Sequence, residues 1–336
     1  AGAIAGAIAG AIAGAIAGAI AGARVGGPHR LAFHSVSLNR RSLMPRAGFV
    51  TLVGKPNAGK SSLLNRLVGE RLAIVSAKPQ STRDRVVGIL SDDTSQLIFL
   101  DTPGLLEPRY ALHRAMRHAA QKAITDADVI VYLVDAVDDQ PGDLAALAGL
   151  PGPLRVPVIL VLNKLDRLSA ERGANLRAKF PEALLVSAVT GVGVAALLDA
   201  IRARLPESPF LYDADDVSTQ QLRFFVAEFL RETVLEQLED EVPYGIAVAI
   251  EEFREDDDPV YIRAVMYVER DSQKRIVIGA GGSRIKEIGQ AARAKIEPLV
   301  GKRVFLDLWV KELHNWRRNA NALARFGYRL PEESGQ

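Results

Sequence analysis

Eight consecutive residues have the types and the spacing of a phosphate-binding loop. Gly54-Lys55-Pro56-Asn57-Ala58-Gly59-Lys60-Ser61 fits the pattern G-x-x-x-x-G-K-[ST] between an apolar run and a helix-like segment. Glycines let backbone N–H groups approach phosphate oxygens, and the start of a helix adds positive potential there. We expect Lys60 to bridge the β- and γ-phosphates of a nucleotide, Ser61 to ligate Mg²⁺, and Ser62 to complete the contacts.

A second polar group follows the apolar run Leu97–Leu100. It is Asp101-Thr102-Pro103-Gly104. An Asp at the carboxyl end of a parallel strand points into the crevice where ligands bind, so we expect Asp101 to hold Mg²⁺, through a water molecule. The Gly104 N–H is then expected to contact the γ-phosphate, a contact that exists only before hydrolysis.

The polar segment Pro79–Arg83 lies between these two groups and is expected to be a mobile switch. The hydroxyl of Thr82 is placed to complete the Mg²⁺ shell. Ser81 is an alternative ligand, because spacing alone does not choose between them.

A third group predicts recognition of guanine. Asn163-Lys164-Leu165-Asp166 follows the apolar run Val158–Leu162, and Ser187-Ala188 follows Ala183–Val186. A carboxylate at Asp166 accepts two hydrogen bonds from guanine, whereas adenine presents no such pair of donors. We expect Asn163 to brace the loop, Lys164 to cover the base with its stem, and the backbone at 187–188 to contact guanine O6. The ligands are therefore GTP and GDP with Mg²⁺.

The residue after Gly104 is Leu105, where many GTPases place a Gln that orients the attacking water. In this respect the motifs resemble the translation-factor-related GTPases with a hydrophobic residue at that position. An Asn of the phosphate loop helps some of those proteins to bind K⁺, which the resemblance implies for Asn57. The alternative is that Asn57 only stabilises the loop. Lys60, Asn57 and Gly104 are thus the candidate catalytic residues.

The last quarter of the chain is strongly basic. Residues 274–329 carry 13 basic residues and four acidic ones, although the whole chain has a net charge of only +2. Such asymmetry indicates binding of a polyanion. The sequence Ile276–Gly289 contains an apolar strand or helix end, a G-x-x-G loop and an amphipathic helix, which is the arrangement of a KH domain, whose loop clamps about four nucleotides.

The candidate RNA-binding residues are the loop and its basic neighbours. They are Lys274, Gly279, Ala280, Gly281, Gly282, Ser283, Arg284 and Lys286.

These groups require a strand–helix alternation that brings strand ends together. Six apolar runs predict strands, at 49–53, 86–90, 97–100, 129–134, 158–162 and 183–186. Helix-like segments separate them, at 60–67, 112–124, 144–150, 170–178 and 194–204. This alternation predicts an α/β P-loop GTPase domain, with a mostly parallel sheet covered by helices on both faces.

A second pattern begins after the break at 205–209. It reads helix 222–238, strands 246–253 and 261–268, the Gly loop, helix 283–299, strand 304–310 and helix 315–326. A start of one helix and two strands predicts a smaller α+β KH domain of type II. We expect a leader at 1–46, a GTPase domain at 47–206, a linker at 207–217, a KH domain at 218–331 and a tail at 332–336.

The first 23 residues are a repeat of Ala, Gly and Ile without charge, which we interpret as an artefact rather than a membrane span. The Arg-rich, acid-free stretch 24–46 permits a transit peptide, and the bland alternative is a disordered leader. The chain has no Cys, which excludes disulfides, Cys-ligated metals and a Cys nucleophile, and favours an intracellular location.

The pairing of a GTPase with a type II KH domain resembles the Era family of ribosome-assembly GTPases, which has members in bacteria, mitochondria and chloroplasts. The resemblance covers residues 48–330. It rests on Val53–Asn65, Pro79–Arg83, Asp101–Gly104, Asn163–Asp166, Glu241–Tyr244, Val268–Arg270 and Ser272–Lys274.

The resemblance implies slow GTP hydrolysis and binding of the small ribosomal subunit, with the KH domain on the 3′ end of its RNA. It also implies that GTP keeps the RNA groove open. A monomer in the cytoplasm is expected, with peripheral contact to the inner membrane, or an organellar location if the leader is a transit peptide. Because of Leu105, an RNA-binding protein that uses GTP only as a structural or regulatory ligand remains the alternative function.

Overall fold

The computed structural model describes residues 44–138 and 140–331. Its larger sheet has six strands in the order β2-β3-β1-β4-β5-β6. The strands are β1 (Arg46–Val53), β2 (Val86–Ser91), β3 (Ser95–Asp101), β4 (Val129–Asp135), β5 (Val158–Asn163) and β6 (Leu184–Leu185). Only β2 runs antiparallel to its neighbour, so the expected mostly parallel sheet is confirmed.

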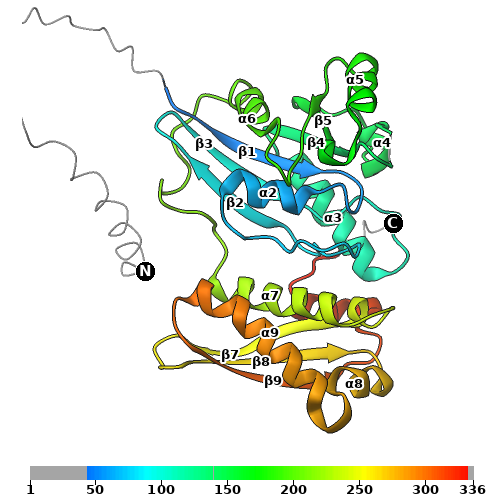
Figure 1. The fold of residues 1–336 in the computed structure, drawn as a ribbon, viewed down its shortest axis with the longest axis vertical. Helices are drawn as coiled ribbons and strands as arrows, with labels where there is room; N and C mark the ends of the chain where they lie inside the picture. The colour runs from blue at the N-terminus through cyan, green and yellow to red at the C-terminus, as the bar shows by residue number, and fades with distance from the viewer. Residues whose placement is uncertain (1–43, 139, 332–336) are drawn as a thin grey trace, which may run out of the picture. The chain divides into compact units, whose positions relative to one another are not determined.

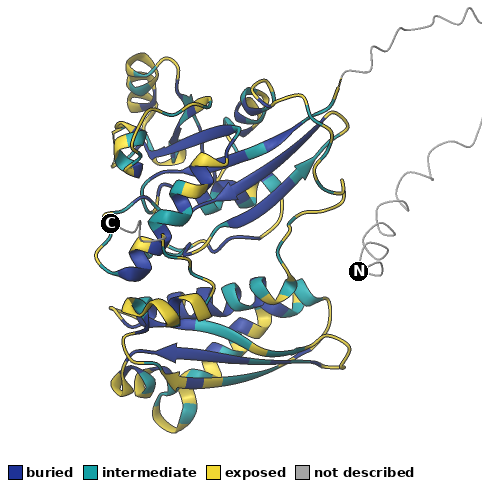
Figure 2. Cartoon of the chain, turned by 180° about the vertical axis from the view of Figure 1, so that it is seen from behind, coloured by how far each residue is buried: buried dark blue, intermediate teal, exposed yellow. Residues whose placement is uncertain are grey.

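Helices cover both faces of this sheet (Figure 1). They are α2 (Lys60–Val68), α3 (Ala111–Thr125), α4 (Leu144–Ala148), α5 (Ala170–Lys179) and α6 (Val194–Arg202). Side chains alternate along β4: Val131 and Leu133 pack with residues of α2 and α6, while Ile130 and Tyr132 pack with residues of α3 and α4. A strand buried on both faces must be apolar throughout, and Figure 2 shows the central strands as buried.

The second part of the chain contains a three-stranded sheet in the order β7-β8-β9. Its elements are α7 (Leu222–Gln237), β7 (Ala247–Arg254), β8 (Val260–Val268), α8 (Asp271–Ile278), α9 (Ser283–Val300), β9 (Val304–Glu312) and α10 (Ala320–Arg325). Strand β7 pairs antiparallel with β8, and β9 pairs parallel with β8. Helices α7 and α9 pack on the same face (Figure 1). The predicted α+β fold that starts with a helix and two strands is confirmed.

The structure differs from the sequence predictions in three elements. The closing helix expected at 315–326 is a short turn at Trp316–Arg318 followed by α10, because the Asn319 side chain caps α10 by accepting from Ala322 N. The apolar run before the Gly loop, expected as a strand or a helix end, is the end of helix α8, which was not among the predicted elements. Strand β1 includes Arg46, whose guanidinium bonds the carbonyls of Ala203 and Leu205.

The expected leader up to residue 43, with its repeat and its candidate transit peptide, and the tail at 332–336 lie outside the described residues. Within the described part of the chain, none of the helices combines the length and the apolar character that a membrane crossing requires.

Candidate functional site

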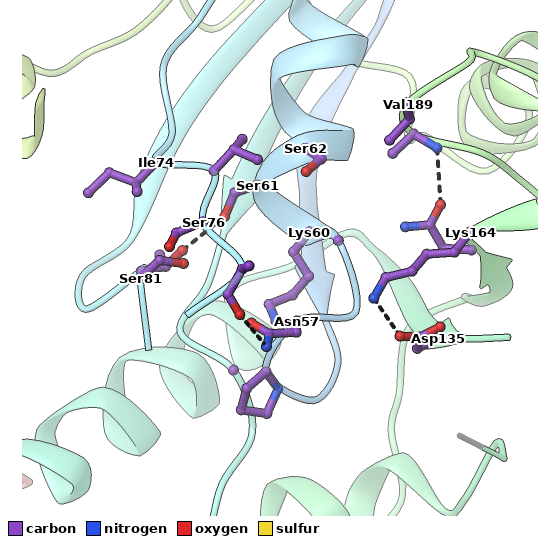
Figure 3. A pocket seen from close by; sticks show the side chains of 18 of the residues that line it. Asn57, Lys60, Ser61, Ser62, Ile74, Ser76, Ser81, Asp135, Lys164 and Val189 are labelled. Atoms are coloured by element: carbon purple, nitrogen blue, oxygen red, sulfur yellow. Dashed lines mark hydrogen bonds and ion pairs between the residues drawn. The ribbon is translucent and has the colours of Figure 1, made fainter. Parts of the chain in front are cut away.

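A pocket of about 480 Å³ opens at the carboxyl ends of the strands of the larger sheet (Figure 3). It collects twelve of the predicted nucleotide and metal residues from five separate segments. They are Pro56, Asn57, Gly59, Lys60, Ser61, Ser62, Thr82, Gly104, Asn163, Lys164, Asp166 and Ala188. The strand order predicts this crevice, because ligands of such sheets bind where the carboxyl ends meet.

Five other predicted residues do not line this pocket. They are Gly54, Lys55, Ala58, Asp101 and Ser187. Asp101 and Ser187 are fully buried just behind it, and each bonds a residue that does line it, Ser61 and Asp166 respectively.

Lys60 is buried at the centre of the phosphate loop. Its Nζ atom donates to the carbonyls of Gly54 at 3.1 Å and Lys55 at 3.0 Å. Burial lowers the pKa of Lys60 to about 8, against an opposing effect of Asp101. Gly59 has φ of 94°, and a Cβ there would lie 2.3 Å from Asn163 Nδ2, so only glycine fits. The arrangement presents a cation and backbone amides where phosphates would lie.

Three polar side chains gather below the loop in the pattern of a Mg²⁺ site. Ser61 Oγ donates to Asp101 Oδ2 at 2.7 Å, and the Thr82 hydroxyl lies 2.9 Å from Ser61 Oγ and 3.3 Å from Asp101 Oδ2. The second oxygen of Asp101 is buried and has no hydrogen-bond partner within the described part of the chain. Burial raises the pKa of Asp101 to about 6. Hydroxyls and an unsatisfied buried carboxylate oxygen fit a hard cation with oxygen ligands.

This geometry separates the two hydroxyl candidates of the switch segment. Thr82 is buried and bonded within the group just described, whereas Ser81 lines the pocket as a partly exposed residue. Spacing alone left this choice open.

The far end of the pocket has the polar groups expected to hold a base. Asn163 Nδ2 donates to the carbonyl of Ala58 at 2.8 Å, and its Oδ1 accepts from Ala188 N at 3.1 Å, which braces the phosphate loop to this end. Ser187 Oγ donates to Asp166. Lys164 forms an ion pair with Asp135, which fixes its stem beside the cavity (Figure 3).

The segment after Asp101 lies directly on the phosphate loop. The backbone N–H of Leu105 donates to the carbonyl of Gly54 at 3.0 Å, and a Cβ on Gly104 would lie 2.7 Å from Pro56 N. Asn57, with φ of 63°, donates from Nδ2 to the carbonyl of Ala77 at 3.1 Å. Asn57 therefore ties the loop to the segment that leads into the switch.

Several lining residues are missing from the sequence predictions. Residues 74–77 and Gln80 form one wall of the pocket, and Asp135, Asp138, Arg167 and Val189 lie near the base end. The wall consists of Ile, Val, Ser and Ala without a motif, so no pattern marks it. Asp135 directly follows the predicted strand 129–134 and is the last residue of β4, and that position is the signal that could have identified it.

A second hollow of about 480 Å³ lies beside the glycine loop between α8 and α9. Gly279, Ala280, Ser283 and Arg284 line it, as the sequence predicts, whereas Lys274, Gly281, Gly282 and Lys286 do not. The opposite side is formed by residues at and just after the end of α7, together with two residues of α8 and α9. They are Gln237, Leu238, Glu239, Ile276 and Glu287. Nothing in the local sequence connects α7 with this loop, so its contribution was missed.

The comparisons with known proteins agree with this division. A family described as 50S ribosome-binding GTPase matches residues 49–164, and a KH domain matches residues 241–317. The GTPase Era of Heliobacterium modesticaldum is 40% identical over 290 residues, which are 84% of this chain and 97% of that protein.

Two solved structures are similar over both parts of the chain. One is Aquifex aeolicus Era bound to GDP and AlF4⁻, and the other is Era in complex with MgGDPNP and nucleotides 1506–1542 of 16S ribosomal RNA. Each is 37% identical, with a TM-score of 0.79, and the match covers 85% of this chain and 100% of the other.

Proposed function

This chain belongs to the Era family of GTPases, and we propose that it is a GTP-controlled factor that holds small-subunit ribosomal RNA near its 3′ end during assembly of that subunit. The observation that carries the proposal is the pair of hollows, one at the phosphate loop and one at the glycine loop. The relative solved with MgGDPNP and 16S ribosomal RNA contains both kinds of ligand.

The division of labour follows the predicted boundaries. A GTPase domain at 47–206 binds the nucleotide, and a KH domain at 218–331 binds RNA. Residues 207–217 connect the two domains. The family is one of enzymes that hydrolyse GTP, so the alternative in which GTP is only a structural ligand is set aside. The protein acts as a monomer in the cytoplasm. The peripheral membrane contact rests on the resemblance, and an organellar location rests on the Arg-rich composition of residues 24–46.

In the nucleotide site the protein contributes position and charge rather than a base. Lys60 contacts the β- and γ-phosphates, and the Gly104 N–H meets the γ-phosphate, while water attacks in line. Ser61, Thr82 and Asp101 would hold Mg²⁺, which when bound neutralises charge on the phosphate oxygens. Leu105 orients no water, so turnover without RNA or ribosome is slow.

The role of Asn57 is the least constrained part of this site. Its Nδ2 donates to the carbonyl of Ala77, which fits a loop-stabilising role, whereas a K⁺ ion at Asn57 is supported by the resemblance to GTPases with a hydrophobic residue after Gly104. GTP turnover is then expected to be faster in KCl than in NaCl. Equal turnover in the two salts would remove K⁺ from the account and leave Asn57 as a loop-stabilising residue.

The specificity for guanine is assigned to the far end of the pocket. Asp166 accepts from the base, the backbone at Ser187 and Ala188 faces its O6 atom, and Lys164 covers its face. Asn163 keeps these groups aligned with the phosphate loop through its two bonds. Competition of GTP against ATP for the same site tests this assignment, and preference for ATP would contradict it.

RNA binding is assigned to the glycine loop. The backbone of residues 279–282 approaches the nucleic acid, and Arg284, Lys274 and Lys286 supply the attraction for phosphate. Glu239 and Glu287 line the same hollow and are acceptors for the amino groups of bases. A single strand is therefore expected to lie between the glycine loop and the end of α7.

One pair of substitutions tests the two activities separately. Lys60→Ala is expected to abolish GTP turnover, and Gly282→Asp is expected to weaken RNA binding while nucleotide affinity stays unchanged. Gly301→Asp is the matched control, because Gly301 also has positive φ and open space but caps the far end of α9. Equal RNA affinities of Gly282→Asp and Gly301→Asp would contradict the clamp.

A further inference from the structure

The side chain of Arg83 extends from the switch segment and contacts the KH domain. Its Nη2 donates to the carbonyl of Tyr244 at 3.0 Å, and its Nη1 donates to the carbonyl of Ile246 at 2.6 Å. The carbonyl between them, of Gly245, accepts from the indole N–H of Trp316 at 2.8 Å. Three consecutive carbonyls of one turn are therefore held by two side chains, and the guanidinium lies 5.7 Å from the Trp316 ring.

Because Arg83 is buried, its contact with the carbonyls of the turn is either fully made or fully lost. The side chain is 4% exposed, and it forms no ion pair with any residue in the described part of the chain. A buried guanidinium without its carbonyl partners is strongly unfavourable, because the charge has lost its hydration. Arg83 therefore either stays on residues 244–246 or leaves the interior and returns to water.

Arg83 also directly follows Thr82, one of the three residues proposed to hold Mg²⁺. Thr82 is 6% exposed, and its hydroxyl lies between Ser61 and Asp101. Because the two residues share a peptide unit, a backbone shift at one of them displaces the other. Withdrawal of Arg83 from the turn would displace Thr82, and loss of the ligand at Thr82 would free Arg83.

Lys78, which directly precedes the switch segment, also reaches the KH domain. Its Nζ atom donates to the carbonyl of Leu235 in the last turn of α7, at 2.6 Å, and to that of Leu238, the C-cap residue. Leu238 and its neighbours line the hollow at the glycine loop. The switch and the residue before it thus contact both the turn 244–246 and the end of the helix that faces the RNA site.

We propose that Arg83 is a positioning residue for GTP hydrolysis, which uses the turn 244–246 of the KH domain to hold Thr82 at the magnesium site. The inference rests on the proposed role of Thr82 in the nucleotide site. It assigns to the KH domain a part in GTP turnover besides RNA binding, since the acceptors that keep the switch closed belong to that domain.

Steady-state GTP hydrolysis by the full chain tests this role. Arg83→Ala is expected to lower kcat by about tenfold or more, with affinity for GDP unchanged within about twofold, because only the closed switch needs Thr82. Arg83→Lys, which reaches one carbonyl, is expected to recover part of kcat. Arg85→Ala is the control: its side chain is 41% exposed, and its contact with Asp126 is 4.0 Å long.

Trp316 provides a readout that contains no RNA. The chain has two Trp residues, so Trp309→Phe leaves Trp316 as the sole reporter of the turn. In this background, exchange of GDP for GDPNP is expected to change the emission of Trp316, and Arg83→Ala is expected to abolish the change. Retention of GDP binding shows that the variant is folded.

Two results would overturn the inference. One is a kcat of Arg83→Ala within about twofold of the parent chain. The other is a Trp316 emission that is the same with GDP and GDPNP, or a change that survives Arg83→Ala. Thr82→Ala separates failure of this inference from failure of the proposed nucleotide site, because a normal kcat in Thr82→Ala would refute the role of Thr82 itself. The kcat and the Trp316 emission are measured without RNA, so they stay valid even if the protein does not bind ribosomal RNA.

Discussion

Asp101 and Lys60 show how burial sets the chemistry of the nucleotide site at the level of single residues. Burial raises the pKa of Asp101 to about 6 and lowers that of Lys60 to about 8, so both groups are charged only in the interval between these values. The proposed magnesium site needs the Asp101 carboxylate deprotonated. Near neutral pH this carboxylate is in the form that the proposed site requires.

This state predicts a pH dependence of magnesium binding. As pH falls through about 6, Asp101 takes up a proton, so the affinity of the GDP-loaded protein for Mg²⁺ is expected to fall by about tenfold per pH unit below that value. A magnesium titration monitored with a fluorescent GDP analogue measures it. In Asp101→Asn only the phosphates of the nucleotide still titrate in this pH range. If magnesium affinity depends on pH in the same way in this variant and in the parent chain, the prediction is contradicted.

His113 gives a second prediction at this scale. Its Nδ1 accepts from Arg109 N, and its Nε2 donates to Gln80 Oε1 at 3.1 Å, so the ring is neutral. Burial, and then the positive charges of Arg109, Arg317 and Arg83, lower the pKa of His113 from 6.5 to about 4. Below pH 6.5 the unfolded chain binds a proton that the folded chain does not, so stability falls with pH in the window from 6.5 to 4.

Replacement of the His113 ring removes its contribution to the pH dependence of stability. The free energy of unfolding of His113→Gln is expected to fall less steeply between pH 6.5 and pH 4 than that of the parent chain. Urea denaturation at several pH values measures both slopes. Parallel slopes would show that His113 is protonated in the folded protein.

At the scale of elements, the segment after β3 meets the phosphate loop without room for a side chain. A Cβ on Gly104 would lie 2.7 Å from the backbone N of Pro56 and 2.8 Å from its Cα. Gly104→Ala must therefore push the two segments apart. We expect kcat for GTP to fall by about tenfold or more, while GDP affinity changes little, because only the γ-phosphate contact is displaced.

Gly173→Ala is the control for this substitution. Gly173 is buried in α5, and a Cβ there would make an ordinary contact of 3.5 Å with Leu165. Hydrolysis by this variant is expected to match that of the parent chain. If Gly104→Ala also turns over normally, the segment after β3 has no catalytic contact to lose.

The sequence predicts most elements of both domains because their signals are local. Strands β2, β4 and β5 are apolar runs of nearly the predicted length, and the glycine and hydroxyl positions of the phosphate loop follow from a motif. What it could not predict depends on tertiary contact. The break at Asn319 depends on one side-chain cap, and the contribution of α7 to the RNA hollow depends on packing against α8 and α9.

The same limit applies to the site. Spacing alone does not distinguish Ser81 from Thr82, because the contacts of Thr82 with Ser61 and Asp101 join residues that lie far apart in sequence. Arg83 carried no signal either, because its acceptors are backbone carbonyls more than 150 residues later, at Tyr244 and Ile246. A motif describes donors that a ligand needs, whereas carbonyl acceptors can come from any residue type.

At the scale of the whole molecule, charge divides the chain. The 13 basic and four acidic residues at 274–329 give the KH domain the potential that a polyanion requires. RNA affinity is therefore expected to fall linearly with salt concentration on logarithmic axes. Lys286→Ala is expected to reduce the slope by about 0.7, the value for one phosphate of a single strand.

Lys302→Ala is the matched control for this slope. Lys302 is an exposed lysine of the same domain, and it donates to the carbonyl of Glu255 beyond the far end of α9. Filter binding of a labelled RNA at several KCl concentrations gives both slopes. Equal slopes for the two variants would place the RNA away from the glycine loop.

The most direct test of the account measures RNA affinity as a function of the bound nucleotide. The probe is a single-stranded RNA with the sequence of the 3′ end of small-subunit ribosomal RNA, titrated into the full chain loaded with GDPNP or with GDP. Binding is expected to be tighter with GDPNP by about tenfold or more, since the switch segment contacts the KH domain. Equal affinities in the two states would contradict the claim that the nucleotide governs how the RNA is held.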